Sequence, residues 1–466
     1  MKTKANKNLV LHILTVLVTA VVLAFLMGEV TRPKFYNDNY WPLDVTYQGF
    51  YEMEKDTVDV LFLGSSHTIS AFSPQELYDV SGIRSFNLGS EEQSLLISYY
   101  WLKEALRYQH PKAVVLDTIL CFPFTETPYN CSEPSIRKSL DPMKWSSVKM
   151  EAVSAIHRLD AEQTLASYVF PLIRYHSRWR DLVPNDFRLW PSQRTDLKGY
   201  AVLSEDYHGE DYEPITDTNA EPSAMQERMR QYLEQITQLC RDNDIQLILV
   251  NTPYTECGAP IHAAVQEYAA EHDLTYIDYN EASVYEILGF DFAHDMADAG
   301  HANTSGAVKL TDHIAEVLLE SGISPAADSQ YEKSRAYCLR QIKNANLYRI
   351  KNYDEYRQSF DWNDYLIFVT GSGENEAALL GLEETGPFAA VYEAGMPQIF
   401  HTDHTAFNWA LNVKYSLHAE EKSGSIRVYD LTYERTGEGL QIVLLDKEKG
   451  YVIDHSVFDS SGSRIQ

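Results

Sequence analysis

An uncharged, strongly apolar run near the start of the chain constrains the protein most. No charged residue occurs from Asn8 to Gly28, where Leu, Val, Ile, Ala and Phe predominate. About 20 helical residues at ~1.5 Å each cross the roughly 30 Å hydrocarbon layer of a bilayer. Lys2, Lys4 and Lys7 precede the run, and the positive-inside rule then predicts a cytoplasmic N-terminus. We expect a single-pass anchor in the cell membrane, with the main body of the chain outside the cytoplasm.

A cleaved signal peptide is the alternative interpretation of this run. The apolar region of a signal peptide covers about 7–15 residues and ends at a cleavage site of small residues. The run here is longer, and no convincing cleavage site follows it. Both interpretations place the remaining chain outside the cytoplasm, where disulfides are permitted. Five cysteines in so long a chain nevertheless exclude a disulfide-built scaffold.

The length and the charge of the chain limit the possible architectures and partners. A chain of 466 residues suggests roughly two to four domains. Hydrophobic residues make up 44% of it and charged residues 23%, which excludes wholesale disorder. The formal net charge is −28, and such a surface would repel phosphates. We therefore expect no nucleic-acid partner.

Changes of pattern along the chain predict five segments. The first is a cytoplasmic tip with the transmembrane anchor, the second is an aromatic-rich stalk that we expect to pack on the following domain, and the third is an α/β domain. A linker and a smaller, β-rich α+β domain complete the chain. The segments cover residues 1–28, 29–55, 56–322, 323–335 and 336–466, and the third contains an insertion at about 122–222.

Short continuous apolar runs alternate with helical patterns in the third segment. Such runs are typical of strands buried on both faces, and their alternation with helices predicts a doubly wound parallel sheet. Ligands bind at the carboxyl ends of such strands, which is where Ser66, Asp117 and Asn251 fall. The predicted strands cover 60–63, 84–88, 113–116, 245–250 and 274–277, and the predicted helices cover 93–108, 224–242, 261–272 and 307–321.

Two glycine-containing turns follow the first two predicted strands. Gly64-Ser65-Ser66-His67 comes directly after the first. A serine on a tight strand-to-helix turn exposes its hydroxyl, and nearby N–H groups can stabilise an oxyanion. Gly89 follows the second strand and lets the backbone approach a reacting oxygen closely. Taken alone, each motif is more often an ordinary turn.

An Asp-x-x-His motif precedes the last predicted helix of this domain. In Asp298-Ala299-Gly300-His301, the carboxylate can accept from one ring nitrogen while the other nitrogen faces a serine. A second motif of this spacing ends at His294. The later copy is preferred because a helix begins directly after it, with Asn303 or Thr304 as its cap. The acidic residues and histidines here match no sharp metal signature, and we expect neither a metal nor a cofactor.

Taken in this order, the three motifs resemble those of the SGNH/GDSL hydrolase superfamily. The resemblance covers about residues 56–322 and implies a flavodoxin-like sheet. On that resemblance Ser66 is the nucleophile, His301 is the general base and Asp298 is its orienting partner. The N–H groups of Ser66 and Gly89 are then the implied oxyanion donors.

The chain departs from the family pattern in two places. The usual aspartate before the serine is Ser65 here, and the Gly-x-Asn-Asp block after the third strand is replaced by Leu116-Asp117-Thr118-Ile119. No third oxyanion donor is identified. These departures motivate an alternative, in which a catalytically inactive scaffold binds polysaccharide or an envelope assembly partner.

A chain with a Gly-Ser-Ser motif behind a single N-terminal anchor is similar to a narrower group of proteins. That group includes the D-alanyl transfer protein of teichoic-acid modification and the alginate O-acetylation proteins. The similarity implies an extracytoplasmic acyltransferase or esterase for O-acyl groups, with acetyl favoured, of cell-envelope or extracellular polysaccharide. A membrane-bound O-acyltransferase is the implied candidate partner. Candidate substrate-binding residues are His67, Asn87, Asp117 and Arg178, the last as a fork-shaped donor.

The C-terminal segment resembles the interleukin-like EMT inducer domain. The resemblance implies a compact β-rich fold and a candidate carbohydrate-binding module, with Trp362, Tyr365 and Trp409 as candidate stacking residues. It rests on residues 361–369, 439–446, 450–452 and 458–459. Predicted strands cover 365–370, 389–392, 426–431 and 440–445, and a predicted helix covers 375–384.

Overall fold

The chain divides into two compact units, with the boundary in the sequence between Arg335 and Ala336. The computed structural model describes residues 2–33, 43–182, 184–187, 196–209 and 212–466. Parts of the expected stalk (34–42) and of the expected insertion (183, 188–195 and 210–211) lie outside the described residues.

The chain begins with helix α1 (Lys2–Thr31). Its segment Leu9–Thr31 is long and apolar enough to cross a membrane, and its most apolar stretch is not buried against the rest of the protein. The helix continues beyond Gly28, the predicted end of the anchor.

The first unit is built on a five-stranded parallel sheet with the order β2-β1-β3-β4-β5. Because alternate side chains point to opposite faces, Leu61 and Leu63 of the first strand join one core, whereas Val60 and Phe62 join the other. The predicted mixed α/β unit with a parallel sheet is thus confirmed. The strands are β1 (Val60–Leu63), β2 (Ser85–Asn87), β3 (Ala113–Asp117), β4 (Gln246–Asn251) and β5 (Thr275–Asp278).

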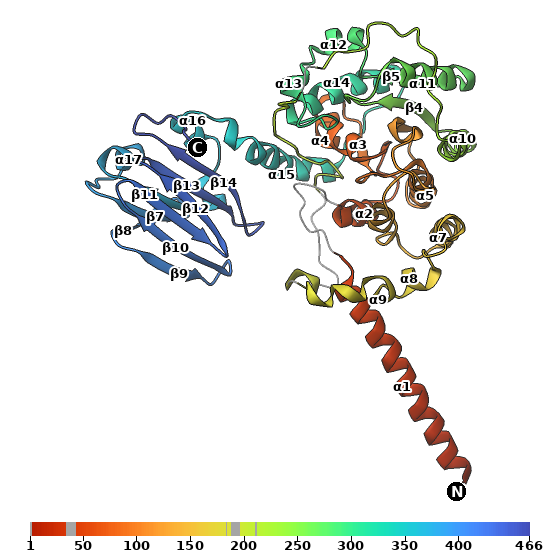
Figure 1. Ribbon diagram of the computed structural model, residues 1–466, viewed down its shortest axis with the longest axis horizontal. Helices are drawn as coiled ribbons and strands as arrows, with labels where there is room; N and C mark the ends of the chain where they lie inside the picture. Colours follow the sequence, from red (N-terminus) through yellow and green to blue (C-terminus); the bar gives the residue numbers. More distant parts are fainter. Residues whose placement is uncertain (1, 34–42, 183, 188–195, 210–211) are drawn as a thin grey trace. The chain divides into compact units, whose positions relative to one another are not determined.

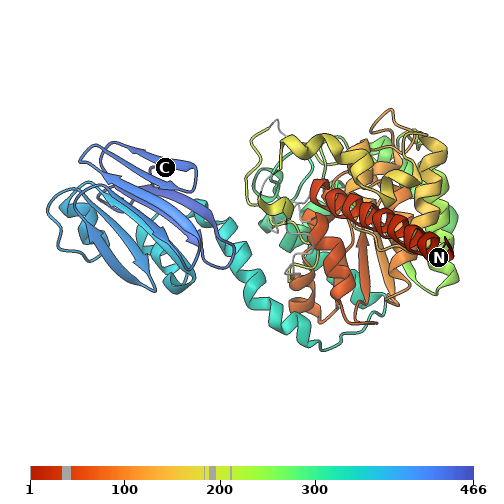
Figure 2. The same ribbon diagram turned by 90° about the horizontal axis from the view of Figure 1, so that it is seen from below.

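Helices cover both faces of this sheet (Figure 2). One core contains side chains of α2 (Leu43–Glu52), α5 (Leu95–Ala105), α6 (Glu133–Leu140), α7 (Ser147–Leu159), α8 (Leu165–Val169), α10 (Glu227–Asp242) and α11 (Ala259–His272). The other contains side chains of α3 (Ser66–Ala71), α4 (Pro74–Ser81), α12 (Ala282–Leu288), α13 (Phe292–Asp295) and α14 (Thr304–Glu320).

Helix α2 belongs to the packed domain, although it lies in the segment expected to be a stalk. Tyr47 and Phe50 are fully buried. The ring of Tyr47 stacks on Trp101 with centroids 4.3 Å apart, and its hydroxyl donates to Gln93 Oε1 at 2.6 Å. These aromatic residues therefore pack on the following domain, as expected.

The expected insertion begins after β3 and returns to the carboxyl edge of the sheet. Its helices α6 and α7 pack against α5. They are followed by α8 and by three short elements, α9 (Leu172–Tyr175), η2 (His176–Arg180) and η3 (Pro184–Phe187). The returning chain is fixed by backbone bonds: Lys198 C=O accepts from Asn87 N–H, and Ala201 N–H donates to Ile69 C=O.

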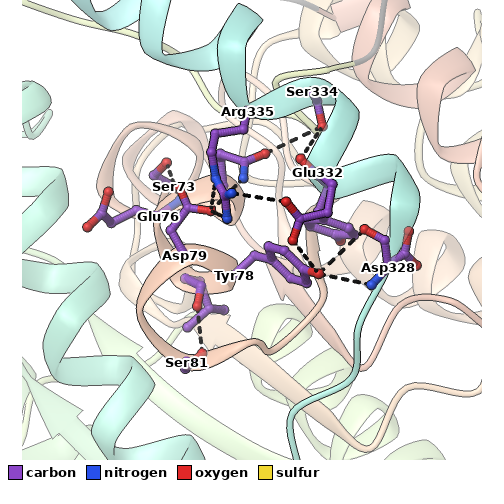
Figure 3. A network of polar contacts seen from close by, with 12 residues as sticks. Ser73, Glu76, Tyr78, Asp79, Ser81, Asp328, Glu332, Ser334 and Arg335 are labelled. Atoms are coloured by element: carbon purple, nitrogen blue, oxygen red, sulfur yellow. Dashed lines mark hydrogen bonds and ion pairs between the residues drawn. The ribbon is translucent and has the colours of Figure 1, made fainter.

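Helix α15 (Ser329–Ala345) begins within the segment expected to be a linker. Its start is bound to α4 by a network of polar contacts (Figure 3). The hydroxyl of Tyr78 accepts from Asp328 N–H at 2.9 Å and donates to Glu332 at 3.3 Å. Arg335 pairs with Asp79 at 2.8 Å. The first turns of α15 are thus part of the first unit.

The second unit contains two antiparallel sheets, which confirms a β-rich C-terminal region (Figure 1). Phe368 of one sheet and Tyr415 of the other share a core. The first sheet has the order β14-β13-β6-β7-β8 and the second β12-β11-β10-β9. The strands are β6 (Tyr365–Gly371), β7 (Phe388–Glu393), β8 (Met396–Phe400), β9 (His404–Asn408), β10 (Val413–Ala419), β11 (Ser423–Val428), β12 (Leu431–Thr436), β13 (Leu440–Asp446) and β14 (Tyr451–Phe458).

The other face of the first of these sheets packs on helices α16 (Tyr353–Gln358) and α17 (Glu374–Leu379). Tyr365 is fully buried there and its hydroxyl donates to Asn344, so it does not offer a face to a sugar. Trp362 packs against Tyr392, whereas Trp409 is 86% exposed.

Candidate active site

The turn after β1 presents Ser66 at the start of α3. Gly64 has φ +155°, and a Cβ on it would lie 2.1 Å from Thr68 Oγ1 and 2.9 Å from Asp117 Cβ. Only glycine fits this position. Ser65 is the helix cap, because its Oγ accepts from the N–H of His67 at 3.3 Å. The tight turn therefore fixes Ser66 as the first residue of the helix.

The loop before α14 carries His301 and is held by Asn303. The Asn303 Oδ1 accepts from the N–H groups of Ser305 and Gly306 and caps the helix, which confirms one of the two predicted caps. Its Nδ2 donates to the carbonyl of His294 at 2.7 Å. The side chain of Asn303 thus forms hydrogen bonds with backbone groups at both ends of this loop.

These two loops bring Ser66, His301 and Asp298 together. Nε2 of His301 lies 2.8 Å from Oγ of Ser66. Nδ1 of the same ring lies 2.8 Å from both carboxylate oxygens of Asp298. The hydroxyl, the imidazole and the carboxylate form a continuous chain of hydrogen bonds, the arrangement that a serine nucleophile, a base and an orienting acid require.

The earlier Asp-x-x-His pair has a different place. Asp291 caps α13 by accepting from Ala293 N–H at 3.1 Å, and His294 is exposed on that short helix. The structure therefore brings the later pair to Ser66.

Electrostatics at the site keep Asp298 ionised and His67 neutral. Partial burial opposes the charge on Asp298, but hydrogen bonds from the His301 ring and from the N–H groups of Gly300 and His301 hold the pKa of its carboxyl below the usual value. Burial, and then the neighbouring His301, lower the pKa of His67 to about 3. A charged Asp298 fixes the tautomer of His301 and stabilises its protonated form.

Gly89 lies against the end of β1. A Cβ on it would lie 2.7 Å from the carbonyl oxygen of Gly64 and 2.9 Å from Ile69 Cγ2. The absence of a side chain lets this backbone reach the turn that carries Ser66. The N–H of Ser66 itself belongs to the first turn of α3, where helical N–H groups have no partner within the helix.

A small cavity of about 90 Å³ opens beside Ser66. One wall is apolar and comes from the β3–α6 connection and the start of α11, and the other carries polar groups. The lining residues are Ser65, Ser66, His67, Glu92, Ile119, Leu120, Phe122, Pro123, Phe124, Tyr254, Glu256 and Ile261. Of the four candidate substrate-binding residues, His67 lies in this lining.

Asn87 and Asp117 support the loops of the site from beneath. Asn87 is fully buried and donates from Nδ2 to the carbonyl of Phe72 at 2.6 Å. Asp117 is buried and accepts from Ile119 N–H and Thr252 Oγ1, and burial raises its pKa to about 6. Both residues are positioned to hold the loops and are not part of the cavity lining.

Arg178 is engaged at the end of α1. Its Nη1 donates to the carbonyl of Thr31 at 2.7 Å, and its Nη2 pairs with Asp186 at 3.2 Å. It is not part of the cavity lining at Ser66.

Sequence reasoning did not identify Tyr254 and Glu256 as lining residues. The ring of Tyr254 lies 4.8 Å from that of His67, and Thr255 N–H donates to the carbonyl of Ala299 at 2.9 Å. This bond ties the loop after β4 to the loop of His301. The sequence did contain a signal for this loop, because ligands bind at the carboxyl ends of parallel strands and the loop follows such a strand.

All five cysteines are buried and none forms a disulfide. A scan against protein-family models finds no match for this chain, and a search of curated proteins finds none either.

Proposed function

We propose that the first unit is an SGNH-type serine acyltransferase or carboxylic ester hydrolase with a flavodoxin-like sheet. The observation that carries the proposal is the hydrogen-bonded chain from Ser66 through His301 to Asp298. The strand order β2-β1-β3-β4-β5 supports it, because this is the flavodoxin-like order and the three residues stand at the carboxyl edge of the sheet.

The geometry supports a two-step acyl transfer. Oγ of Ser66 attacks the ester carbonyl carbon while His301 Nε2 takes its proton, and the C–O bond to the leaving alcohol then breaks as His301 returns the proton to that oxygen. An acyl-serine remains. In the second step His301 takes a proton from a sugar hydroxyl or from water, whose oxygen attacks the acyl carbon; the bond from that carbon to Oγ of Ser66 then breaks as His301 returns the proton to Oγ.

The proposed oxyanion donors are the N–H groups of Ser66 and Gly89. Backbone N–H groups directed at a developing negative charge are among the strongest contributors to such catalysis. The cavity beside Ser66, about 90 Å³, accommodates an acyl group of a few carbon atoms. Acetyl, which the resemblance favours, fits within this range.

The proposed location is the cell membrane, with α1 as a single-pass anchor, the N-terminus in the cytoplasm and both units outside. There the acceptor is a cell-envelope or extracellular polysaccharide, and a membrane-bound O-acyltransferase is the proposed donor partner. The second unit is proposed to be an interleukin-like EMT inducer-type domain that binds carbohydrate. The exposed ring of Trp409 is its best-placed stacking residue.

The test is hydrolysis of a chromogenic acetyl ester by the full chain in lipid nanodiscs. Ser66→Ala should lower the rate at least ~100-fold. Ser70→Ala is the matched control, because Ser70 lies on the same helix and bonds to the carbonyl of His67. Equal rates for the wild type and Ser66→Ala would exclude Ser66 from the mechanism. A wild type that binds polysaccharide without turning over esters would favour the inactive scaffold.

A further inference from the structure

The short elements α9, η2 and η3 lie beside the carboxyl end of α1 (Figure 1). A Cβ on Gly28 would lie 3.0 Å from Leu172 N and 3.2 Å from Pro171 Cδ, so the two backbones are in close contact. Arg178 donates to the carbonyl of Thr31 at 2.7 Å. These contacts fix the three elements at the level of the last turns of α1.

The same elements expose large apolar side chains. Ile173 on α9 is 53% exposed, Trp179 on η2 is 63% exposed and Phe187 on η3 is 62% exposed. Single exposed apolar residues are ordinary, but here three stand on successive elements beside one helix end. We call these three residues the juxtamembrane patch.

Arginine is the basic residue of the segment that carries this patch. Residues 172–187 contain Arg174, Arg178 and Arg180 beside Asp181 and Asp186. Arg174 pairs with Glu133 at 2.6 Å and Arg178 with Asp186 at 3.2 Å, so the positive charge next to Trp179 is that of Arg180. The guanidinium of Arg180 lies 5.2 Å from the centre of the Trp179 ring. Tryptophan with arginine is the combination favoured at the membrane–water interface, where the ring and the aliphatic stem are buried and the charge stays in water.

The length of α1 places the patch at that interface. Leu9–Thr31 comprises 23 residues, about 34 Å of helix, which is slightly more than the roughly 30 Å hydrocarbon layer. The turn that contains Gly28 and Thr31 therefore lies at the outer boundary of the hydrocarbon. Elements held against this turn share its depth.

We propose that Ile173, Trp179 and Phe187 insert into the headgroup region of the bilayer that α1 crosses. The partner is the lipid interface itself, and its contact holds the first unit against the membrane surface. The inference rests on the proposed function in one respect, because it requires α1 to span a bilayer.

The experiment uses the full chain in vesicles of phosphatidylcholine and phosphatidylglycerol. Ile173→Cys and Trp179→Cys are labelled separately with an environment-sensitive dye, which is selective because the native cysteines are buried. Both labels should show blue-shifted emission and quenching by a lipid with a quencher near the headgroup. Ile287→Cys is the matched control, since this exposed apolar residue of α12 should keep the emission of a label in water.

Leu17→Cys, in the middle of α1, separates the two hypotheses. A label there should be quenched by a lipid with a quencher deep in the acyl chains. If Leu17 is quenched while the labels at 173 and 179 behave like that at 287, the anchor stands and the patch inference is wrong. Water-like emission from the labels at 173 and 179 would indicate that the partner of the patch is a protein. If Leu17 is not quenched, the anchor fails and the patch inference fails with it.

Discussion

The imidazole of His67 lies edge-to-face against that of His301, with ring centroids 4.9 Å apart and an interplanar angle of 74°. Nδ1 of His67 is buried and has no hydrogen-bond partner among the described residues, whereas both nitrogens of His301 are engaged. Because the pKa of His67 is lowered to about 3, it is neutral near pH 7. It therefore adds no like charge beside the protonated His301 ring that the proposed mechanism requires.

This depressed pKa predicts a pH-dependent stability. The unfolded His67 takes up a proton near pH 6.5 and the folded one only near pH 3, so its contribution is present above pH 6.5 and is lost as the pH falls toward 3. The loss approaches ~1.4 kcal/mol per pH unit. In urea unfolding at pH 7 and pH 4.5, His67→Gln should lose less stability than the wild type. Parallel losses in the two proteins would contradict the prediction.

The contribution of Asp117 to stability should have the opposite pH dependence. Burial raises its pKa to about 6 from 3.8, so the ionised carboxyl destabilises the folded state above pH 6, and the penalty disappears as the pH falls toward 4. Asp117→Asn should therefore match or exceed the wild type in melting temperature at pH 8 and lose this advantage at pH 4. A variant that is less stable than the wild type at pH 8, with the same deficit at pH 4, would show that the charge is needed for its hydrogen bonds.

Gly89 should tolerate no side chain. A Cβ would lie 2.7 Å from the Gly64 carbonyl oxygen, so Gly89→Ala must displace the turn of Ser66 at a cost of about 1–3 kcal/mol. Alanine keeps the N–H, so the effect on catalysis comes from the displacement: if this N–H is an oxyanion donor, moving it away from the reacting oxygen should lower kcat by up to about 10²–10³-fold. Gly258→Ala is the control, because its Cβ would meet only Pro260 Cδ, at 3.8 Å. Full activity of Gly89→Ala together with the expected loss of stability would remove this donor from the mechanism.

The two Asp-x-x-His pairs provide a matched test of the base. His301→Gln should lower kcat by about 10²–10⁴-fold, the usual contribution of a general base. Asp298→Asn should lower kcat with little change in KM, because an amide cannot stabilise the protonated ring. Asp291→Asn should leave activity unchanged, since asparagine caps a helix as well as aspartate does. Equal effects at 291 and 298 would mean that both substitutions act through folding.

Strands buried on both faces could be predicted from the sequence within a residue or two. The run 60–63 coincides with β1, and 113–116 lacks only Asp117 of β3. Such strands need apolar residues at every position, which leaves a continuous signal. The Asp298-His301 pair was also predictable, because its spacing lies within one loop and Asn303 marks the helix start.

Half-exposed strands of the second unit could not be found in this way. Strand β12 has exposed residues at most positions and β8 contains Pro397, so neither gives a continuous apolar run. The contribution of Tyr254 to the cavity depends on how the loop after β4 is tied to Ala299. The position of this loop at the carboxyl end of a strand could be predicted, but which of its residues line the cavity depends on a contact between segments far apart in the chain.

Ser66 and His301 are separated by 235 positions in the chain. Domains fold as units, and ribosomes add about 5–20 residues each second. Roughly 12–47 seconds of synthesis therefore separate the appearance of Ser66 from that of His301. In the proposed mechanism, a nascent chain that still lacks His301 has no group to take the proton of Ser66, so its hydroxyl is not yet activated. Reactivity at Ser66 then begins only once the first unit has closed, and labelling by a serine-directed probe would report that moment.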